Sequence, residues 1–179
     1  MMTEKLQDAL NRQIIAELWS ANLYLSMSFY FRKQGFDGFA HWMKEQSREE
    51  TEHACMFADY LIKRGGRNPT LTKVDEVPQS WDSPLDAFRH VYGHECEVSE
   101  MIDRLMQTAI EEKDNATQEF LWHFVREQVE EEATAESIAE KIRMVGDIVW
   151  TLFVLRNRNS ISRKTCLKSC KKKVSVRAK

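Results

Sequence analysis

Residues 39–60, FAHWMKEQSREETEHACMFADY, decide the fold because they place ionisable groups in the middle of a helical apolar stripe. Aromatic side chains recur at steps of three and four, from Phe39 and Trp42 to Phe57 and Tyr60, which is the spacing of one helix face. Glu50 and His53 fall on the same face, midway along it. Because ionisable side chains are rarely buried without a partner, the stretch predicts an amphipathic helix with a polar centre on its buried face.

Three other segments repeat the same periodicity, so the sequence predicts four long helices. Six glycines and three prolines are few for 179 residues, which disfavours a many-stranded sandwich or barrel. Residues that suit N-caps stand before three of the helices, namely Asp37, Ser83 and Asn115. The expected helices cover about 3–34, about 38–65, a segment that opens at Pro84, and 115–146.

The segment between the second and third helices, 66–82, has no helical period and contains Pro69 and Pro78. A helix of roughly 28 residues is about 42 Å long, and a connection of this size, extended at about 3.3 Å per residue, reaches about 56 Å. The connection is therefore long enough to run the length of a bundle. The sequence predicts an all-α four-helix bundle with one long crossover, which makes the second and third helices parallel.

Charge divides the chain into an expected bundle domain, 1–146, and a basic tail, 147–179. The first part has 16 Lys and Arg against 27 Asp and Glu, and the tail has 10 against one. The acidic bundle disfavours a specific nucleic-acid partner, although the tail alone could attract phosphates nonspecifically. The tail is basic, has no apolar period, and has no packed role that the sequence assigns.

The chain lacks the sequence features of a membrane or secreted protein. No apolar run approaches the roughly 18 residues of a spanning helix. The N-terminus lacks the pattern of a signal peptide, and the four cysteines show no metal or disulfide spacing. We therefore expect a cytoplasmic protein with no membrane partner.

Each of the four apolar stripes is interrupted near its middle by polar or charged side chains. The middles of equal, alternately directed helices lie at one level of a bundle, so these side chains are expected to converge. Any one of these side chains could be an ordinary solvated Glu or a packed His. Four interruptions at the same depth are much harder to explain in that way. The six residues are Glu17, Glu50, His53, Glu95, Gln128 and Glu131.

Four carboxylates in one dry layer need either protons or a cation, because each unpaired buried ion costs several kcal/mol. No Lys or Arg lies on the stripes. Two divalent metals would balance four negative charges, and carboxylate oxygens with one imidazole suit Fe(II) or Mn(II) better than a metal that prefers thiolates. Glu50 and His53, at i and i+3, point the same way. The pattern predicts a dinuclear metal site in which Glu50 bridges.

Several other side chains have two interpretations. Glu49, Glu127 and Glu130 are either a peripheral third cation site or a solvated acidic face. Tyr24 is either an electron or proton donor near the metals or a packing residue, and for Trp122 packing is favoured. The remaining expectations are structural roles for His41, His90, His94 and His123, burial of Cys55 and Cys96, and a close helix approach at Gly93.

Four motifs resemble those of the ferritin family, specifically the bacterial non-haem ferritins. They are QIIAEL at 13–18 with Tyr24, EETEH at 49–53, His94-Glu95, and EQVEEE at 127–132. The resemblance covers about residues 3–146. Ferritin-like di-iron bundles are generally described as having two Glu-x-x-His motifs. In this chain Gln128-x-x-Glu131 stands in place of the second motif. Thr51 stands where bacterioferritins have a haem-ligating Met, so no haem is expected.

The resemblance implies a ferroxidase that oxidises Fe(II) with O2 or H2O2 and stores ferric mineral in a shell of 24 subunits. It implies that Glu17, Glu50 and His53 hold the first iron, and that Glu50, Glu95 and Glu131 hold the second. Gln128 would hydrogen-bond near the second iron or bound oxygen, and Tyr24 would be the family's tyrosine beside the centre. The implied ligands of a third iron are Glu49, Glu127, Glu130 and Glu131.

Two alternatives to this function remain open from the sequence. A rubrerythrin-like di-iron peroxidase would use a similar bundle, but such proteins usually carry a second Glu-x-x-His and a Cys-rich iron domain. A noncatalytic helical protein could bind nucleic acid through its basic tail. The tail also departs from the family, whose members continue beyond the equivalent of Gly146 with a short fifth helix.

Overall fold

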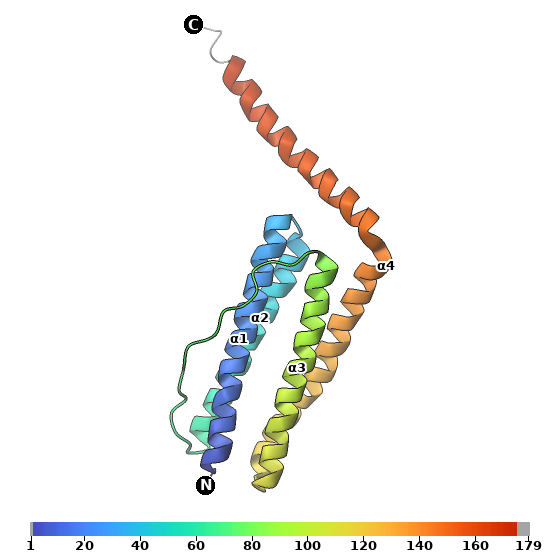
Figure 1. Ribbon diagram of the computed structural model, residues 1–179. Coiled ribbons are helices and arrows are strands. Elements are labelled where there is room, and N and C mark those ends of the chain that lie inside the picture. Colours follow the sequence, from blue (N-terminus) through green and yellow to red (C-terminus); the bar gives the residue numbers. More distant parts are fainter. Residues whose placement is uncertain (1, 175–179) are drawn as a thin grey trace. The chain divides into compact units, whose positions relative to one another are not determined.

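The computed structural model describes the backbone of residues 2–174 and the side chains of residues 2–146. The chain divides into two compact units, Met1–Glu140 and Lys141–Lys179, which are described separately. The first unit contains α1 (Glu4–Gln34), α2 (Asp37–Lys63), α3 (Pro84–Glu111) and the first part of α4 (Asn115–Val174) (Figure 1). The described residues contain no strand. The predicted all-α four-helix bundle is confirmed.

Side chains cap two of the helix starts, and the cap at Ser83 was predicted. Thr3 precedes α1 and its hydroxyl accepts a hydrogen bond from the backbone N–H of Leu6 at 3.4 Å. Ser83 accepts from the N–H of Asp86 at 3.1 Å, and Pro84 takes the first position of α3. Such caps satisfy backbone donors that have no partner inside the helix.

The predicted caps Asp37 and Asn115 are wrong by one position. Asp37 is already helical, and Phe36, which has no capping side chain, precedes α2. At α4 the cap is Asp114, whose Oδ1 accepts from the N–H of Thr117 at 2.9 Å. Arg64 also binds both carboxylate oxygens of Asp114, at 3.0 and 2.9 Å. Asp114 therefore both caps the start of α4 and ties it to the C-terminal end of α2.

The crossover between α2 and α3 runs along α1 (Figure 1). Its contacts follow α1 in order: Arg67 pairs with Asp8, the side chain of Asn11 exchanges hydrogen bonds with the backbone of Thr70 at 3.0 and 2.7 Å, and the ring of Trp81 packs 5.2 Å from that of Tyr30. The connection therefore covers most of the helix length, as predicted, and α2 and α3 run in the same direction.

Apolar clusters lie on both sides of the bundle centre. Toward the N-terminus of α1, Phe57 and Phe124 stack with centroids 4.3 Å apart within a cluster that includes Leu6, Leu10 and Ile102. Toward the C-terminus of α1, the rings of Phe31, Phe39 and Phe88 pack with centroid distances of 5.0 to 5.8 Å. The residues that interrupt the stripes lie between these two clusters.

Four structural expectations about single residues are wrong in this unit. The apolar spacing of the first helix predicts burial of Phe29, but Phe29 is 60% exposed, because a straight helix drifts by about 20° per heptad and Phe31 takes the buried position instead. Trp122 is 52% exposed and Cys55 is also exposed, because each lies beside the buried face of its helix. A side chain at Gly93 would meet no atom within 4 Å, so no close helix approach explains this glycine.

The second unit is described by its backbone. Gly146 has a positive φ of 68° with ψ of 166°, which interrupts α4, and the helical backbone then continues to Val174. The sequence did not predict this helix because the tail lacks an apolar period, although it also lacks the glycines and prolines that end helices. None of the described helices is both long and apolar enough to cross a membrane.

Candidate metal centre

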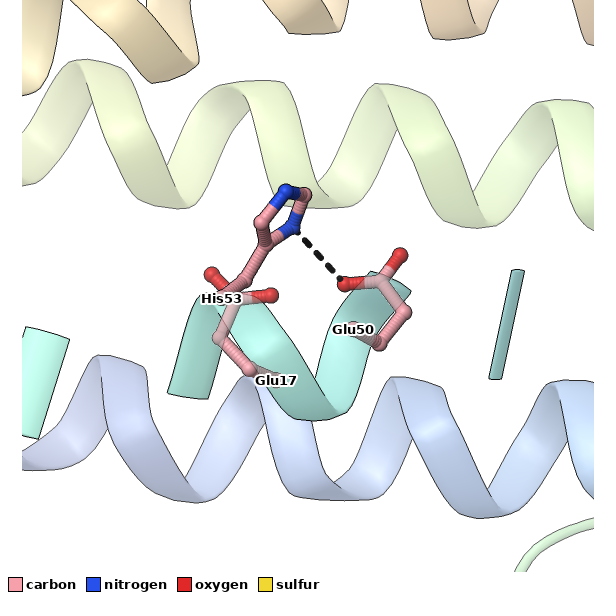
Figure 2. Close-up of side chains that lie close together, drawn as sticks. All are labelled: Glu17, Glu50 and His53. Atoms are coloured by element: carbon pink, nitrogen blue, oxygen red, sulfur yellow. Dashed lines mark ion pairs between the residues drawn. The ribbon is translucent and has the colours of Figure 1, made fainter. Parts of the chain in front are cut away.

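Carboxylates from three helices are buried at the same level of the bundle. Glu17 of α1, Glu50 of α2 and Glu95 of α3 are 2%, 5% and 1% exposed. Figure 2 shows Glu17 and Glu50 on neighbouring helices, with His53 one turn from Glu50. Ligand atoms of Glu17, Glu50 and His53 all lie within 4.8 Å of one another, a separation that a single metal ion could span.

Contacts around the first group orient its side chains. Nδ1 of His53 lies 3.5 Å from Oε2 of Glu50, and the imidazole packs edge-on against Phe124 at 5.4 Å. Oε1 of Glu17 accepts a hydrogen bond from Nε2 of Gln13 at 2.9 Å, which the i, i+4 spacing on α1 allows. These neighbours restrict the positions of the three side chains.

Glu95 is the centre of a second group of contacts. The Tyr24 O–H donates a hydrogen bond to Oε1 of Glu95. Nε2 of Gln128, from α4, donates to Oε2 of the same carboxylate at 3.2 Å. The structure therefore brings both predicted neighbours of the centre, Tyr24 and Gln128, onto Glu95.

Glu131 completes the four carboxylates and is half-buried. Its Oε2 accepts a hydrogen bond from Nε2 of Gln46 at 3.4 Å, and Gln46 also reaches Oε2 of Glu49 at 3.5 Å. Gln46 thus links α2 to α4. Gln46 has the helical spacing of the apolar stripe between Trp42 and Glu50, but a single amide gives no sign of which neighbouring helix it will contact.

The electrostatics favour protons on these carboxylates when no cation is present. Burial raises the pKa of Glu50 to about 8, with a further contribution from the charge of Glu95. Burial and the same charge raise the pKa of Glu131 to about 7. Burial also raises the pKa of Glu17 well above its ordinary value, with Glu50 adding to it. The site is therefore short of positive charge.

A third group lies beside the first and shares His53 with it. Ligand atoms of Glu49, His53 and Glu127 lie within 4.8 Å of one another. Nε2 of His53 is 3.5 Å and Nε2 of His123 is 3.2 Å from Oε2 of Glu127, a buried oxygen that accepts no hydrogen bond among the described residues. Of the remaining predicted members, Glu130 is exposed and Glu131 is half-buried, and neither is part of this group.

His123 lies beside the site, whereas the sequence predicted only a structural role for this histidine. The signal for it was its i, i+4 spacing from Glu127 on one helix. His94 differs, because its Nε2 forms a hydrogen bond with the Ser20 hydroxyl at 2.9 Å, and burial lowers its pKa to about 4. Its neutral, hydrogen-bonded imidazole is consistent with the structural role that the sequence predicted.

Buried and half-buried carboxylates from four helices, beside one shared histidine, are the arrangement found in the class of ferritin-like four-helix bundles with carboxylate metal sites. The comparison with protein families agrees, since residues 7–145 match the model of the ferritin-like domain. The chain belongs to the ferritin family.

Relatives and solved structures support the family. The chain is 60% identical over 147 residues to a bacterial non-heme ferritin of Bacteroides fragilis strain 638R, covering 82% of this chain and 92% of that protein. It is 34% identical to a bacterial non-heme ferritin of Staphylococcus epidermidis, covering 86% and 92%. An open-pore ferritin of the hyperthermophilic archaeon Archaeoglobus fulgidus is 50% identical, with a TM-score of 0.82 and coverage of 87% and 95%.

Proposed function

We propose that this chain is a ferroxidase subunit that oxidises Fe(II) to Fe(III) at the buried carboxylate centre and stores ferric mineral in a shell. The observation that carries the proposal is the cluster of Glu17, Glu50 and His53, whose ligand atoms lie within 4.8 Å of one another at the centre of a bundle of the ferritin family. Divalent cations would replace the protons that these carboxylates otherwise hold. The oxygen-rich donor set with one imidazole suits Fe(II).

In this proposal Glu17, Glu50 and His53 bind one Fe(II), and Glu50, Glu95 and Glu131 bind the other. The first set is supported by ligand atoms that lie within 4.8 Å of one another, and the second set rests on the resemblance to bacterial ferritins. Tyr24 and Gln128 hold opposite oxygens of Glu95, so they position that ligand. Glu50 would belong to both sets and would supply a carboxylate to each ion.

The centre brings two one-electron donors together for a two-electron oxidant. Two Fe(II) give up one electron each, and O2 takes both electrons with two protons to form H2O2. With H2O2 as oxidant, the same two electrons and two protons form two waters. The chain's contribution is to bind both Fe(II) ions side by side and to keep their ligands oriented.

We further propose that Glu49, His53 and Glu127 form a third iron site beside the centre. The buried Oε2 of Glu127, which accepts no hydrogen bond among the described residues, supports it. Glu130 would join only at the exposed edge of this site.

The proposed assembly is a shell of 24 subunits in the cytoplasm, as the resemblance to bacterial ferritins implies. No haem is proposed, because Thr51 stands where bacterioferritins have a haem-ligating Met.

The test is an anaerobic Fe(II) titration followed by exposure to O2. We expect two tightly bound Fe(II) per chain at the centre, rapid Fe(III) formation, and then uptake of many more iron atoms per assembled shell. Glu50→Ala should lose rapid oxidation. Undiminished oxidation by this variant would contradict the ferroxidase proposal, and uptake that stops at the bound ions would contradict storage.

A further inference from the structure

Trp42 is an oxidisable neighbour of Tyr24 and extends toward the surface. The Tyr24 O–H donates to Glu95, so the phenol lies one hydrogen bond from a proposed iron ligand. Its ring meets the ring of Trp42 edge-on, with centroids 6.3 Å apart and planes at 85°. Tyr24 is fully buried and Trp42 is half-buried. The two rings therefore connect the proposed centre with the outer part of the bundle.

A second aromatic branch leads from Tyr24 but contains an imidazole. The ring of His94 is 6.2 Å from that of Tyr24, and the ring of Trp19 is 5.3 Å beyond His94. An imidazole gives up an electron far less readily than a phenol or an indole does. This branch therefore offers no stepwise path through an oxidisable ring from Tyr24 to Trp19. Trp19 is half-buried like Trp42, which makes it a matched control.

We propose that Trp42 is a redox relay residue, which supplies an electron to Tyr24 when an oxidant reaches the centre before two Fe(II) are bound. The inference rests on the proposed ferroxidase function. With one Fe(II) present, H2O2 still needs two electrons, and only one comes from iron. Tyr24, which touches Glu95, is the nearest oxidisable side chain that the contacts place there.

The electron and proton balance closes with the groups on this path. Fe(II) and the Tyr24 phenol each give one electron to H2O2, which takes two protons from solvent and becomes two waters. The phenol proton moves along its hydrogen bond to Glu95. Trp42 then gives an electron to the tyrosyl radical, Tyr24 takes its proton back from Glu95, and the indole N–H proton passes to solvent. The net products are Fe(III), two waters and a neutral tryptophan radical.

The location of Trp42 allows the radical to be removed away from the iron ligands. Its indole is half-buried, and apart from Tyr24 it packs against the ring of Phe88 at 5.6 Å, which is not oxidisable under these conditions. A further Fe(II) or another one-electron reductant at the surface can reduce the indole radical. The relay would spare the buried ligand Glu95 and the tyrosine from oxidative damage.

The experiment uses the full chain in its natural assembly. The protein is loaded anaerobically with one Fe(II) per chain, mixed with an equal amount of H2O2, and frozen at increasing times for electron paramagnetic resonance. Samples grown with ring-deuterated tyrosine or tryptophan assign the radical without any substitution. We expect an early signal that tyrosine deuteration narrows and a later one that tryptophan deuteration narrows.

Single substitutions then identify which tryptophan carries the radical. Trp42→Phe should lose the tryptophan signal and lengthen the life of the tyrosine signal severalfold, and Tyr24→Phe should lose both. Trp19→Phe and Trp122→Phe should behave like the unmodified chain. Circular dichroism and the Fe(II) binding stoichiometry establish that each variant is folded and loaded.

Fe(III) formation, measured in parallel with two Fe(II) per chain and O2, separates the two proposals. If Fe(III) forms but no tryptophan radical appears in the unmodified chain, the relay is refuted and the ferroxidase proposal stands. A tryptophan radical that survives Trp42→Phe refutes the relay in the same way. If Fe(III) does not form, the ferroxidase proposal itself is refuted.

Discussion

Glu50→Gln tests whether the metal-free centre lacks positive charge, because it removes one ionisable carboxylate and keeps the size of the side chain. Burial, with the charge of Glu95, raises the pKa of Glu50 from 4.5 to about 8 in the folded chain. Between these pH values the metal-free folded state holds a proton that the unfolded state has released. The contribution of Glu50 to stability is therefore most favourable below pH 4.5 and declines as pH rises through about 8.

The magnitude follows from the same shift. At about 1.4 kcal/mol per pH unit, ionised Glu50 lowers the free energy of unfolding of the metal-free chain by at most about 5 kcal/mol above its folded pKa. A glutamine at this position does not ionise and avoids this cost. We expect Glu50→Gln to be more stable than the unmodified chain by about 2 kcal/mol or more at about pH 8.5, and nearly equal at about pH 5.

Guanidinium unfolding of metal-free protein measures this difference, with both chains at one protein concentration because assembly also contributes to stability. Glu52→Gln, an exposed position on the same helix, is the control and should change little at either pH. Anaerobic Fe(II) should reverse the order, since the unmodified chain binds more metal. Equal or lower stability of metal-free Glu50→Gln at about pH 8.5 would refute the conclusion that ionised Glu50 destabilises the metal-free chain.

Three further predictions follow from the packing and the proposed sites. Phe57→Ala should lower the free energy of unfolding by about 3 to 5 kcal/mol, measured by denaturant titration, because it opens a cavity in the stacked cluster. Glu127→Gln should reduce anaerobic Fe(II) binding beyond the first two ions, whereas Glu130→Gln should not; equal isotherms would argue against the third site. Deleting 147–179 should leave Fe(II) binding at the centre unchanged, since its ligands lie within Met1–Glu140; loss of binding in a folded truncation would contradict this.

The sequence predicted the helices and the crossover because both depend on local information. Apolar spacing determines which segments are amphipathic helices, and the length of 66–82 is enough to run along one of them. The caps at Asp37 and Asn115 were wrong because adjacent residues compete for a helix end. At α4 the capping residue, Asp114, is also bound by Arg64, which lies 50 positions away in the sequence. No local pattern contains that contact.

The convergence of Glu17, Glu50 and His53 was predictable because each interrupts an apolar stripe at the same depth. Their roles as iron ligands stay a prediction. The contacts of Gln46 with Glu131 and of His123 with Glu127 were not predicted. A glutamine on a stripe or a histidine on a helix surface is ordinary, and its partner depends on how neighbouring side chains and helices are oriented.

Folding stability and metal binding depend on the same few side chains in this bundle. Apolar clusters above and below the centre supply the packing, while the carboxylates between them oppose folding whenever they are ionised without a cation. A binding cation relieves that opposition, so part of the metal affinity comes from electrostatic strain in the metal-free chain. Substitutions that stabilise the metal-free bundle at Glu17, Glu50 or Glu95 should therefore weaken metal binding, whereas stabilising substitutions in the apolar clusters should leave it intact.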